Sequence, residues 1–230
     1  MYNILLYISI PTMFNNCNPR TNGEKWFFDH IKKNINTIFD VGCRQDSEFV
    51  EFEGEVHYFD PVPTFIENLS KQRNVNKQSY FNNFGLGSEN KTSDYYPRYQ
   101  SFFDRVNSCK ETDSHNKITL TIKKADEYMN DKGIQRVDLL KIDTEGYEFE
   151  VIKGFGDYIE RVNLIQFEYG GCFMDSGVKL GDVIDHLKSH GFEKFSYLVN
   201  HGVSPISDFS DHYQYCNIVC INKNSTYKPF

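Results

Sequence analysis

The clearest indication of the fold is the segment Val137-Asp-Leu-Leu-Lys-Ile-Asp-Thr-Glu-Gly-Tyr-Glu-Phe-Glu-Val-Ile-Lys-Gly154. Its nearly continuous apolar run, Val137 to Ile142, predicts a strand that is buried on both faces of a parallel sheet. The run stops at Asp143, and a helical pattern with one apolar face follows at once. Acidic residues therefore gather at the carboxyl end of a central strand, which is where open α/β sheets bind their ligands.

Predicted strands and helices alternate along the rest of the chain, which indicates a βαβ sheet in one domain over residues 1–230. Residues 1–36 form an N-terminal strand and helix cap, 37–223 the core, and 88–117, which are polar, aromatic and irregular, an insertion or lid. The other predicted strands are Ile4–Ile10, Thr37–Gly42, Glu55–Asp60, Ser79–Leu86, Ile118–Ile122, Val162–Tyr169, Phe195–Val199 and Tyr215–Ile221. The predicted helices are Trp26–Lys33, Ser47–Glu53, Thr64–Gln72, Ala125–Asp131 and Lys179–His190.

Composition excludes several classes of protein. The formal net charge is -7 and no basic block occurs, so we expect no nucleic-acid partner, because neutralising phosphates requires clustered Lys and Arg. The six cysteines form no C-x-x-C pair, which argues against a zinc site and favours a reduced, cytoplasmic protein. The apolar run Ile4–Ile10 lacks a basic flank and is too short to cross a bilayer, so we expect a strand there and no membrane partner.

The first two core strands end in residues that suit a nucleoside ligand. The first ends in Asp40-Val-Gly-Cys43, and a strand that enters a glycine turn brings backbone N–H groups against a ligand. The second ends at Asp60, about twenty residues on, where an acidic side chain commonly binds ribose hydroxyls. Asp60 could instead begin an Asp-Pro turn. A G-x-G-x-x-G fingerprint is absent, so a pyrophosphate cradle is poorly supported.

Four segments together resemble the FkbM-type methyltransferases, a family of class I S-adenosylmethionine-dependent enzymes that are mostly O-methyltransferases of sugars and related small molecules. The segments are Asp40-Val-Gly42, His57-Tyr-Phe-Asp-Pro61, Asn83-Phe-Gly-Leu-Gly87 and Leu140-Lys-Ile-Asp-Thr-Glu-Gly-Tyr-Glu148. The last is the most specific, whereas the glycine turn is generic to class I enzymes. The resemblance implies a Rossmann-like three-layer α/β sandwich, with a seven-stranded, mostly parallel sheet and helices on both faces.

The resemblance also implies the cofactor, S-adenosyl-L-methionine, and the residues that hold it. Asp40 and Gly42 would shape the turn around its methionine part, Asp60 would hold the ribose, and Phe84 to Leu86 would line the adenine. The full set of expected cofactor residues is Asp40, Gly42, Cys43, Arg44, Asp60, Pro61, Phe84, Gly85, Leu86 and Asp143. The family usually has a further Asn and Gly after the first turn, where this chain has Arg44 and Asp46. Arg44 could pair with the cofactor carboxylate or lie on the surface.

Three carboxylates are the candidate catalytic groups: Asp143 at a strand end, Glu145 in the following turn and Glu168 near the end of the next strand. Convergent carboxylates raise one another's proton affinity, so one of them becomes basic near neutral pH. Glu145 and Glu148 could instead be acids that complement a helix dipole, and we expect the buried Lys141 to pair with a carboxylate. The three carboxylates could also ligate Mg²⁺, but nothing in their spacing requires it, and we expect no metal.

Other general bases and other functions remain open. His115 and His212 are alternative bases. The expected partner is a small-molecule or glycan acceptor, and a homo-oligomer is compatible with the sequence. A non-catalytic glycan-binding adapter is an alternative, since sugar rings stack on aromatic side chains, and the insertion holds Tyr95, Tyr96, Tyr99, Phe102 and Phe103. These aromatics also suit a flap over the site, which we favour. A nicotinamide-dependent sugar oxidoreductase is less well supported, because the glycine fingerprint and a Tyr-x-x-x-Lys pair are missing.

Overall fold

The computed structural model describes residues 14–72 and 78–230. The strand predicted at Ile4–Ile10 lies outside these residues. The strands of the main sheet are β1 (Thr37–Val41), β2 (Glu55–Phe59), β3 (Ser79–Asn82), β7 (Val137–Ile142), β8 (Val162–Tyr169), β9 (Phe192–Val199), β10 (Gly202–Pro205) and β11 (Cys216–Asn222). The helices are α1 (Glu24–Ile31), α2 (Pro63–Ser70), α3 (Ala125–Lys132), α4 (Glu148–Lys153), α5 (Cys172–Ser176) and α6 (Leu180–Ser189), with a 3-10 helix η1 (Gly156–Arg161).

The described part of the main sheet has eight strands, in the order β10-β9-β11-β8-β7-β1-β2-β3. The five neighbouring strands β3, β2, β1, β7 and β8 pair in parallel. Beyond β8, the strands β11, β9 and β10 pair antiparallel. The sheet therefore has one strand more than the seven expected, since the short edge strand β10 was not predicted, while the class I α/β fold is as expected. None of the helices in the described residues combines the length and the apolar character needed to cross a bilayer.

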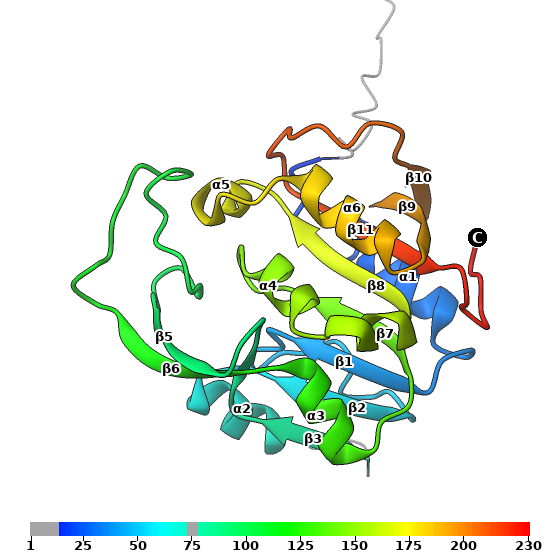
Figure 1. Cartoon of the computed structure of the whole chain (residues 1–230), viewed down its shortest axis with the longest axis horizontal. Coiled ribbons are helices and arrows are strands. Elements are labelled where there is room, and N and C mark those ends of the chain that lie inside the picture. Colours follow the sequence, from blue (N-terminus) through cyan, green and yellow to red (C-terminus); the bar gives the residue numbers. More distant parts are fainter. Residues whose placement is uncertain (1–13, 73–77) are drawn as a thin grey trace, which may run out of the picture.

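Helices cover both faces of the sheet and complete the three layers (Figure 1). Alternate side chains of a strand point to opposite faces, so neighbours in β1 enter different cores. Phe39 packs in a cluster with buried residues of α3, α4 and α6, whereas Ile38 packs with residues of α1 and α2. Both side chains are fully buried, which explains why the central strands read as continuous apolar runs.

A second, smaller sheet lies beside the first. It consists of β4 (Gly85–Leu86), β5 (Lys91–Tyr95) and β6 (Ile118–Lys123), in the order β4-β6-β5. The strand predicted over Ser79–Leu86 is therefore divided between two sheets. The insertion 88–117 is also less irregular than expected, because β5 pairs antiparallel with β6 and the two strands carry the loop between them away from the main sheet and towards α5 (Figure 1).

The helix predicted at Ser47–Glu53 does not form, and the segment consists of turns. Ser47 explains the failure, because its hydroxyl donates to Asp40 Oδ2 at 2.5 Å and accepts the N–H of Phe49 at 3.2 Å. Such local side-chain bonds compete with helical hydrogen bonding. The turn of Ser47 is thereby tied to the end of β1.

Candidate active site

A cavity of about 570 Å³ opens where the carboxyl ends of β1, β2, β7 and β8 meet. Most residues expected at the site line it: Asp40, Gly42, Cys43, Arg44, Asp60, Pro61, Gly85, Leu86, Asp143, Glu145 and Glu168. Phe84 does not line this cavity. Its ring lies 5.9 Å from that of Phe59 and 6.0 Å from that of Tyr128, with the Lys123 ammonium 4.5 Å from its centroid.

The glycine turn after β1 is tightly packed against the loop after β7. Gly42 has φ +79°, and a Cβ on it would lie 1.9 Å from the carbonyl oxygen of Asp143. The N–H of Gly42 donates to Phe59 at 2.9 Å, and the N–H of Asp143 donates to Val41 at 2.9 Å. Only glycine therefore permits the ends of β1, β2 and β7 to approach this closely.

Asp60 is held at the end of β2 by backbone donors. Its Oδ1 accepts the N–H of Val62 at 2.9 Å, and its Oδ2 accepts the N–H of Arg44 at 3.1 Å. The first bond is the Asp-Pro turn that the sequence offered as an alternative, so the turn and the position on the cavity wall coexist. Burial raises the pKa of Asp60 to about 6. Ligand hydroxyls that donate to the carboxylate would favour its charged form.

Asp40 carries a buried oxygen that lacks a partner in the described residues. The residue is 1% exposed, and its Oδ1 has no hydrogen-bond partner, while its Oδ2 accepts from Ser47. Burial raises the pKa of this carboxyl. A buried oxygen without a partner is costly unless a ligand supplies a donor. The ammonium group of a bound methionine moiety is such a donor, so Asp40 fits the cofactor that the sequence implies.

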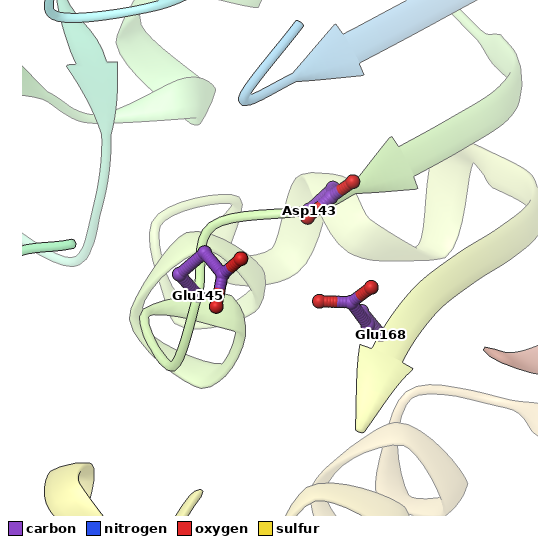
Figure 2. Close-up of side chains that lie close together, drawn as sticks. All are labelled: Asp143, Glu145 and Glu168. Carbon is purple, nitrogen blue, oxygen red and sulfur yellow. The ribbon is translucent and has the colours of Figure 1, made fainter. Parts of the chain in front are cut away.

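The three expected catalytic carboxylates converge beyond the ends of β7 and β8 (Figure 2). One oxygen each of Asp143, Glu145 and Glu168 lies within 4.8 Å of the others, a spacing at which carboxylates could also hold a cation. Two of the three carboxylates lie beside cationic side chains. Lys141 Nζ lies 3.3 Å from Asp143 Oδ2, as expected for the buried lysine, and Arg105 forms an ion pair with Glu145.

Glu168 differs from the other two carboxylates, because no cation of the described residues lies within ion-pair distance of it. Burial raises the pKa of Glu168 well above its usual range, and the Asp143 and Glu145 carboxylates raise it further. A carboxylate with a raised pKa is a stronger base than an ordinary one, which suits proton removal near neutral pH.

Glu148 holds the loop that carries Glu145. It is fully buried, and its carboxylate accepts the N–H of Thr144 at 2.9 Å, the hydroxyl of Thr144 at 3.1 Å and the N–H of Gly146 at 2.9 Å. These bonds fix a left-handed backbone at Glu145, with φ +55°, and at Gly146, with φ +109°. Glu148 is thus an acid at the start of α4, as expected, and it also shapes the loop that carries Glu145.

Several side chains at or near the site differ from expectation. Arg105 was missed, because a single Arg in an irregular segment carries no local pattern that predicts burial; it is 8% exposed and lines the cavity. His115 and His212 do not line this cavity, and His212 bonds the hydroxyl of Tyr197 at 3.2 Å. Among the insertion aromatics, Tyr95 and Phe102 line the cavity, with ring centroids 5.2 Å apart.

Comparison with known proteins shows the family. The model of the methyltransferase FkbM domain matches residues 40–194, which is most of the chain and includes every expected cofactor and catalytic residue named above. No curated protein matches the sequence.

Similar solved structures are distant. A fibrillarin pre-rRNA processing protein from Methanococcus jannaschii is 12% identical with a TM-score of 0.48, over 90% of this chain and 76% of that one. SMU.1697c, a putative methyltransferase from Streptococcus mutans in complex with SAH, is 10% identical with a TM-score of 0.47, over 87% and 97%. A TehB-like SAM-dependent methyltransferase from Corynebacterium glutamicum is 14% identical with a TM-score of 0.46, over 87% and 88%. The family match carries the assignment: the chain belongs to the FkbM methyltransferase family, whose cofactor is S-adenosyl-L-methionine.

Proposed function

We propose that this chain is an O-methyltransferase that methylates a hydroxyl group of a sugar or glycan-related small molecule. The observation that carries the proposal is the arrangement of three convergent carboxylates beside the glycine turn and Asp60, with Glu168 alone among the three lacking a cation partner in the described residues. A family member with this arrangement has a cofactor wall on one side of its cavity and a candidate base on the other.

The cofactor wall uses residues of the first two strand ends. Asp60 would accept the ribose hydroxyls, Asp40 would accept the ammonium group through its unpaired Oδ1, and Gly42 permits the tight turn that would hold the methionine part. When bound, S-adenosylmethionine supplies a methyl group that is already activated on a sulfonium sulfur. The protein therefore has only to align an acceptor oxygen with that methyl group and to remove the proton of the oxygen.

Glu168 is the proposed general base. It would take the proton of the acceptor hydroxyl while that oxygen forms its bond to the methyl carbon and the carbon–sulfur bond breaks. Asp143 and Glu145 are each paired with a cation. Burial and the Asp143 carboxylate raise the pKa of Glu145, but the Arg105 guanidinium opposes this rise, whereas no such cation of the described residues opposes the rise at Glu168. We assign Asp143 and Glu145 to hydrogen bonds with neighbouring hydroxyl groups of the acceptor, since a carboxylate offers several acceptor sites to a polyol.

The charges around the cavity support an uncharged acceptor. Each of the three cationic residues that line the cavity among the described residues already has an acidic partner. Arg44 Nε lies 3.9 Å from Asp46 Oδ1, Lys141 pairs with Asp143, and Arg105 pairs with Glu145. A phosphate or carboxylate group on the acceptor would therefore find no unpaired cation among the described lining residues and would face several carboxylates. A hydroxyl-rich, uncharged molecule matches this lining better.

The test measures methyl transfer from radiolabelled S-adenosylmethionine to a panel of neutral methyl glycosides, oligosaccharides and polyols. Glu168→Gln should lower the rate by about 100-fold or more, the usual contribution of a general base, while the dissociation constant for S-adenosylhomocysteine stays unchanged. Glu193→Gln, at an exposed position of β9, is the matched control and should behave as wild type. Incubation with EDTA should not reduce the rate if the reaction needs no metal.

Two results would contradict the proposal. Transfer that persists in Glu168→Gln would remove Glu168 as the base. Cofactor binding without transfer to any acceptor of the panel would favour the non-catalytic adapter.

A further inference from the structure

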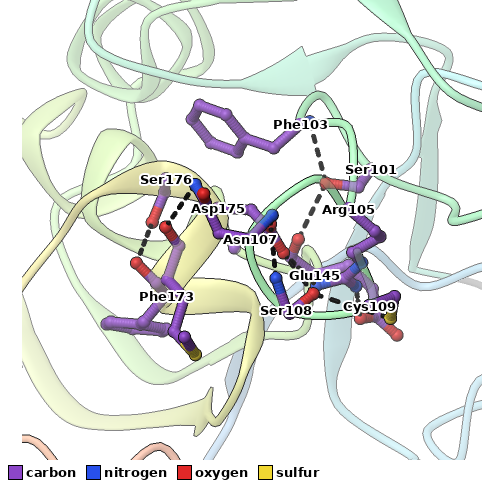
Figure 3. Close-up of polar contacts among 12 residues, drawn as sticks. Ser101, Phe103, Arg105, Asn107, Ser108, Cys109, Glu145, Phe173, Asp175 and Ser176 are labelled. Carbon is purple, nitrogen blue, oxygen red and sulfur yellow. Dashed lines mark hydrogen bonds and ion pairs between the residues drawn. The ribbon is translucent and has the colours of Figure 1, made fainter. Parts of the chain in front are cut away.

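Arg105 joins three parts of the molecule that are distant in sequence (Figure 3). It belongs to the insertion 88–117, yet its side chain is only 10% exposed, and its guanidinium forms an ion pair with Glu145 in the loop between β7 and α4. On its other side, Nη1 lies 3.6 Å from Oδ2 of Asp175 in α5, whose side chain is fully buried. Arg105 is also the sole Arg or Lys of the insertion among the described residues that line the cavity.

The insertion is anchored to the protein by other bonds on both sides of Arg105. Ser101 donates its hydroxyl to the carbonyl oxygen of Glu145 at 2.7 Å. Asp175 accepts the N–H of Asn107 at 2.8 Å, the N–H of Ser108 at 3.0 Å and the hydroxyl of Ser108 at 2.5 Å (Figure 3). The donors in these anchors are neutral N–H and hydroxyl groups, so the loop is already fastened without Arg105, and fastening alone does not explain the burial of its guanidinium.

The carboxylate of Glu145 explains better why the guanidinium of Arg105 is buried. Two further acids, Asp143 and Glu168, face Glu145 across the cavity, and its own backbone is left-handed. Repulsion among three converging carboxylates would turn an unpaired Glu145 side chain towards solvent. The ionisable groups of the neighbouring elements that act on Glu145 or on Arg105 are Asp143 after β7, Glu168 in β8, Arg44 after β1, Arg105 in the insertion, and Cys172 and Asp175 in α5.

We propose that Arg105 is a positioning residue for methyl transfer, which holds the Glu145 carboxylate in the acceptor side of the cavity and thereby makes the insertion part of the active site. This inference rests on the proposed function. It assigns Arg105 no contact with the cofactor, since Asp40, Asp60 and Gly42 lie at the ends of β1 and β2 and Arg105 contacts the loop after β7 and α5.

The test compares Arg105→Met, Arg105→Lys and the control Ser101→Ala, which removes a bond from the insertion to the same residue but leaves the Glu145 carboxylate paired. Acceptor turnover should fall about tenfold or more in Arg105→Met, be partly restored in Arg105→Lys and stay near wild type in Ser101→Ala. All three variants should bind S-adenosylhomocysteine within about twofold of wild type, because uncontacted sites are normally independent.

A second measurement needs no acceptor, so it separates failure of this inference from failure of the proposed function. Carbon-13 NMR titration of the Glu145 carboxyl, in protein saturated with S-adenosylhomocysteine, should show its pKa raised by about one unit or more in Arg105→Met, since an opposite charge at this distance lowers a carboxyl pKa by about 1–3 units. Ser101→Ala should leave it unchanged. An unchanged pKa in Arg105→Met, or equal losses of turnover in Arg105→Met and Ser101→Ala, would overturn the positioning role. If Arg105→Met does not fold, the partial loss of turnover expected in Arg105→Lys is compared with the wild-type turnover expected in Ser101→Ala, and equal turnover in these two variants would overturn the role.

Discussion

Replacing Asp60 by Asn should weaken cofactor binding strongly. Asp60 is 3% exposed, and bonds from Val62 and Arg44 already fix both of its oxygens at the cavity wall. Asn keeps the size but offers one acceptor oxygen, and its amide group would turn a donor towards a backbone N–H or towards a ribose hydroxyl. Losing one hydrogen bond to a charged group costs about 1.5–3 kcal/mol. The dissociation constant for S-adenosylhomocysteine should therefore rise about 10- to 100-fold.

The affinity for S-adenosylhomocysteine should also depend on pH, because Asp60 titrates near the physiological range. Burial raises the pKa of Asp60 to about 6 in the free protein, and ribose hydroxyls that donate to the carboxylate favour its charged form. Affinity should therefore be constant above about pH 7 and should decline as the pH falls through 6, by at most about tenfold per pH unit. Asp60→Asn cannot titrate at this position, so this part of the pH dependence should disappear.

Isothermal titration calorimetry with S-adenosylhomocysteine between pH 5 and pH 8 measures both effects. Glu67→Gln is the matched control, since Glu67 lies in the neighbouring helix α2, is exposed and pairs only with Lys71 among the described residues. An Asp60→Asn protein that binds within twofold of wild type, or that keeps the wild-type decline below pH 6, would refute the ribose assignment.

Two further predictions concern residues that hold the strand ends together. Gly42→Ala places a Cβ 1.9 Å from the Asp143 carbonyl oxygen at a residue with φ +79°. Thermal denaturation should show a free energy of unfolding lower by about 1–3 kcal/mol or more, and calorimetry should show no cofactor binding. Gly181→Ala, whose added Cβ has its nearest contact at 3.8 Å, should change neither quantity. Lys141→Met leaves Asp143, whose side chain is one third exposed, without its ion-pair partner, so chemical denaturation should show a loss of about 1–3 kcal/mol in the free energy of unfolding. A loss below about 1 kcal/mol would mean that Lys141 does not stabilise the acidic end of β7.

The central part of the fold could be predicted from the sequence, because its signals are local. The apolar run Val137–Ile142 forms β7 over the predicted residues, and Asp143 and Glu168 lie at the ends of neighbouring strands as expected. Parallel pairing brings such strand ends to one edge of the sheet. A pattern of strands with acids after them is therefore enough to predict that the acids meet.

The remaining features depend on contacts between distant segments. The unpredicted pairing of β5 with β6 joins the first part of the insertion to the strand that follows it, and the ion pair of Arg105 with Glu145 spans 40 residues. The predicted helix at Ser47–Glu53 failed because one hydroxyl bonds Asp40 and a nearby backbone N–H. Periodicity within a short window contains no information about any of these contacts.

Binding of S-adenosylhomocysteine to the unmodified protein shows whether the ends of β1 and β2 form a cofactor site. We expect saturable binding of one molecule per chain, with a dissociation constant in the micromolar range and competition by S-adenosylmethionine. At 100 times the dissociation constant the ligand should stabilise the native state by about 2.7 kcal/mol, which for a chain of this length raises the melting temperature by roughly 5–10 °C. An unchanged melting temperature with no binding heat, or binding of NADH in place of S-adenosylhomocysteine, would contradict the account.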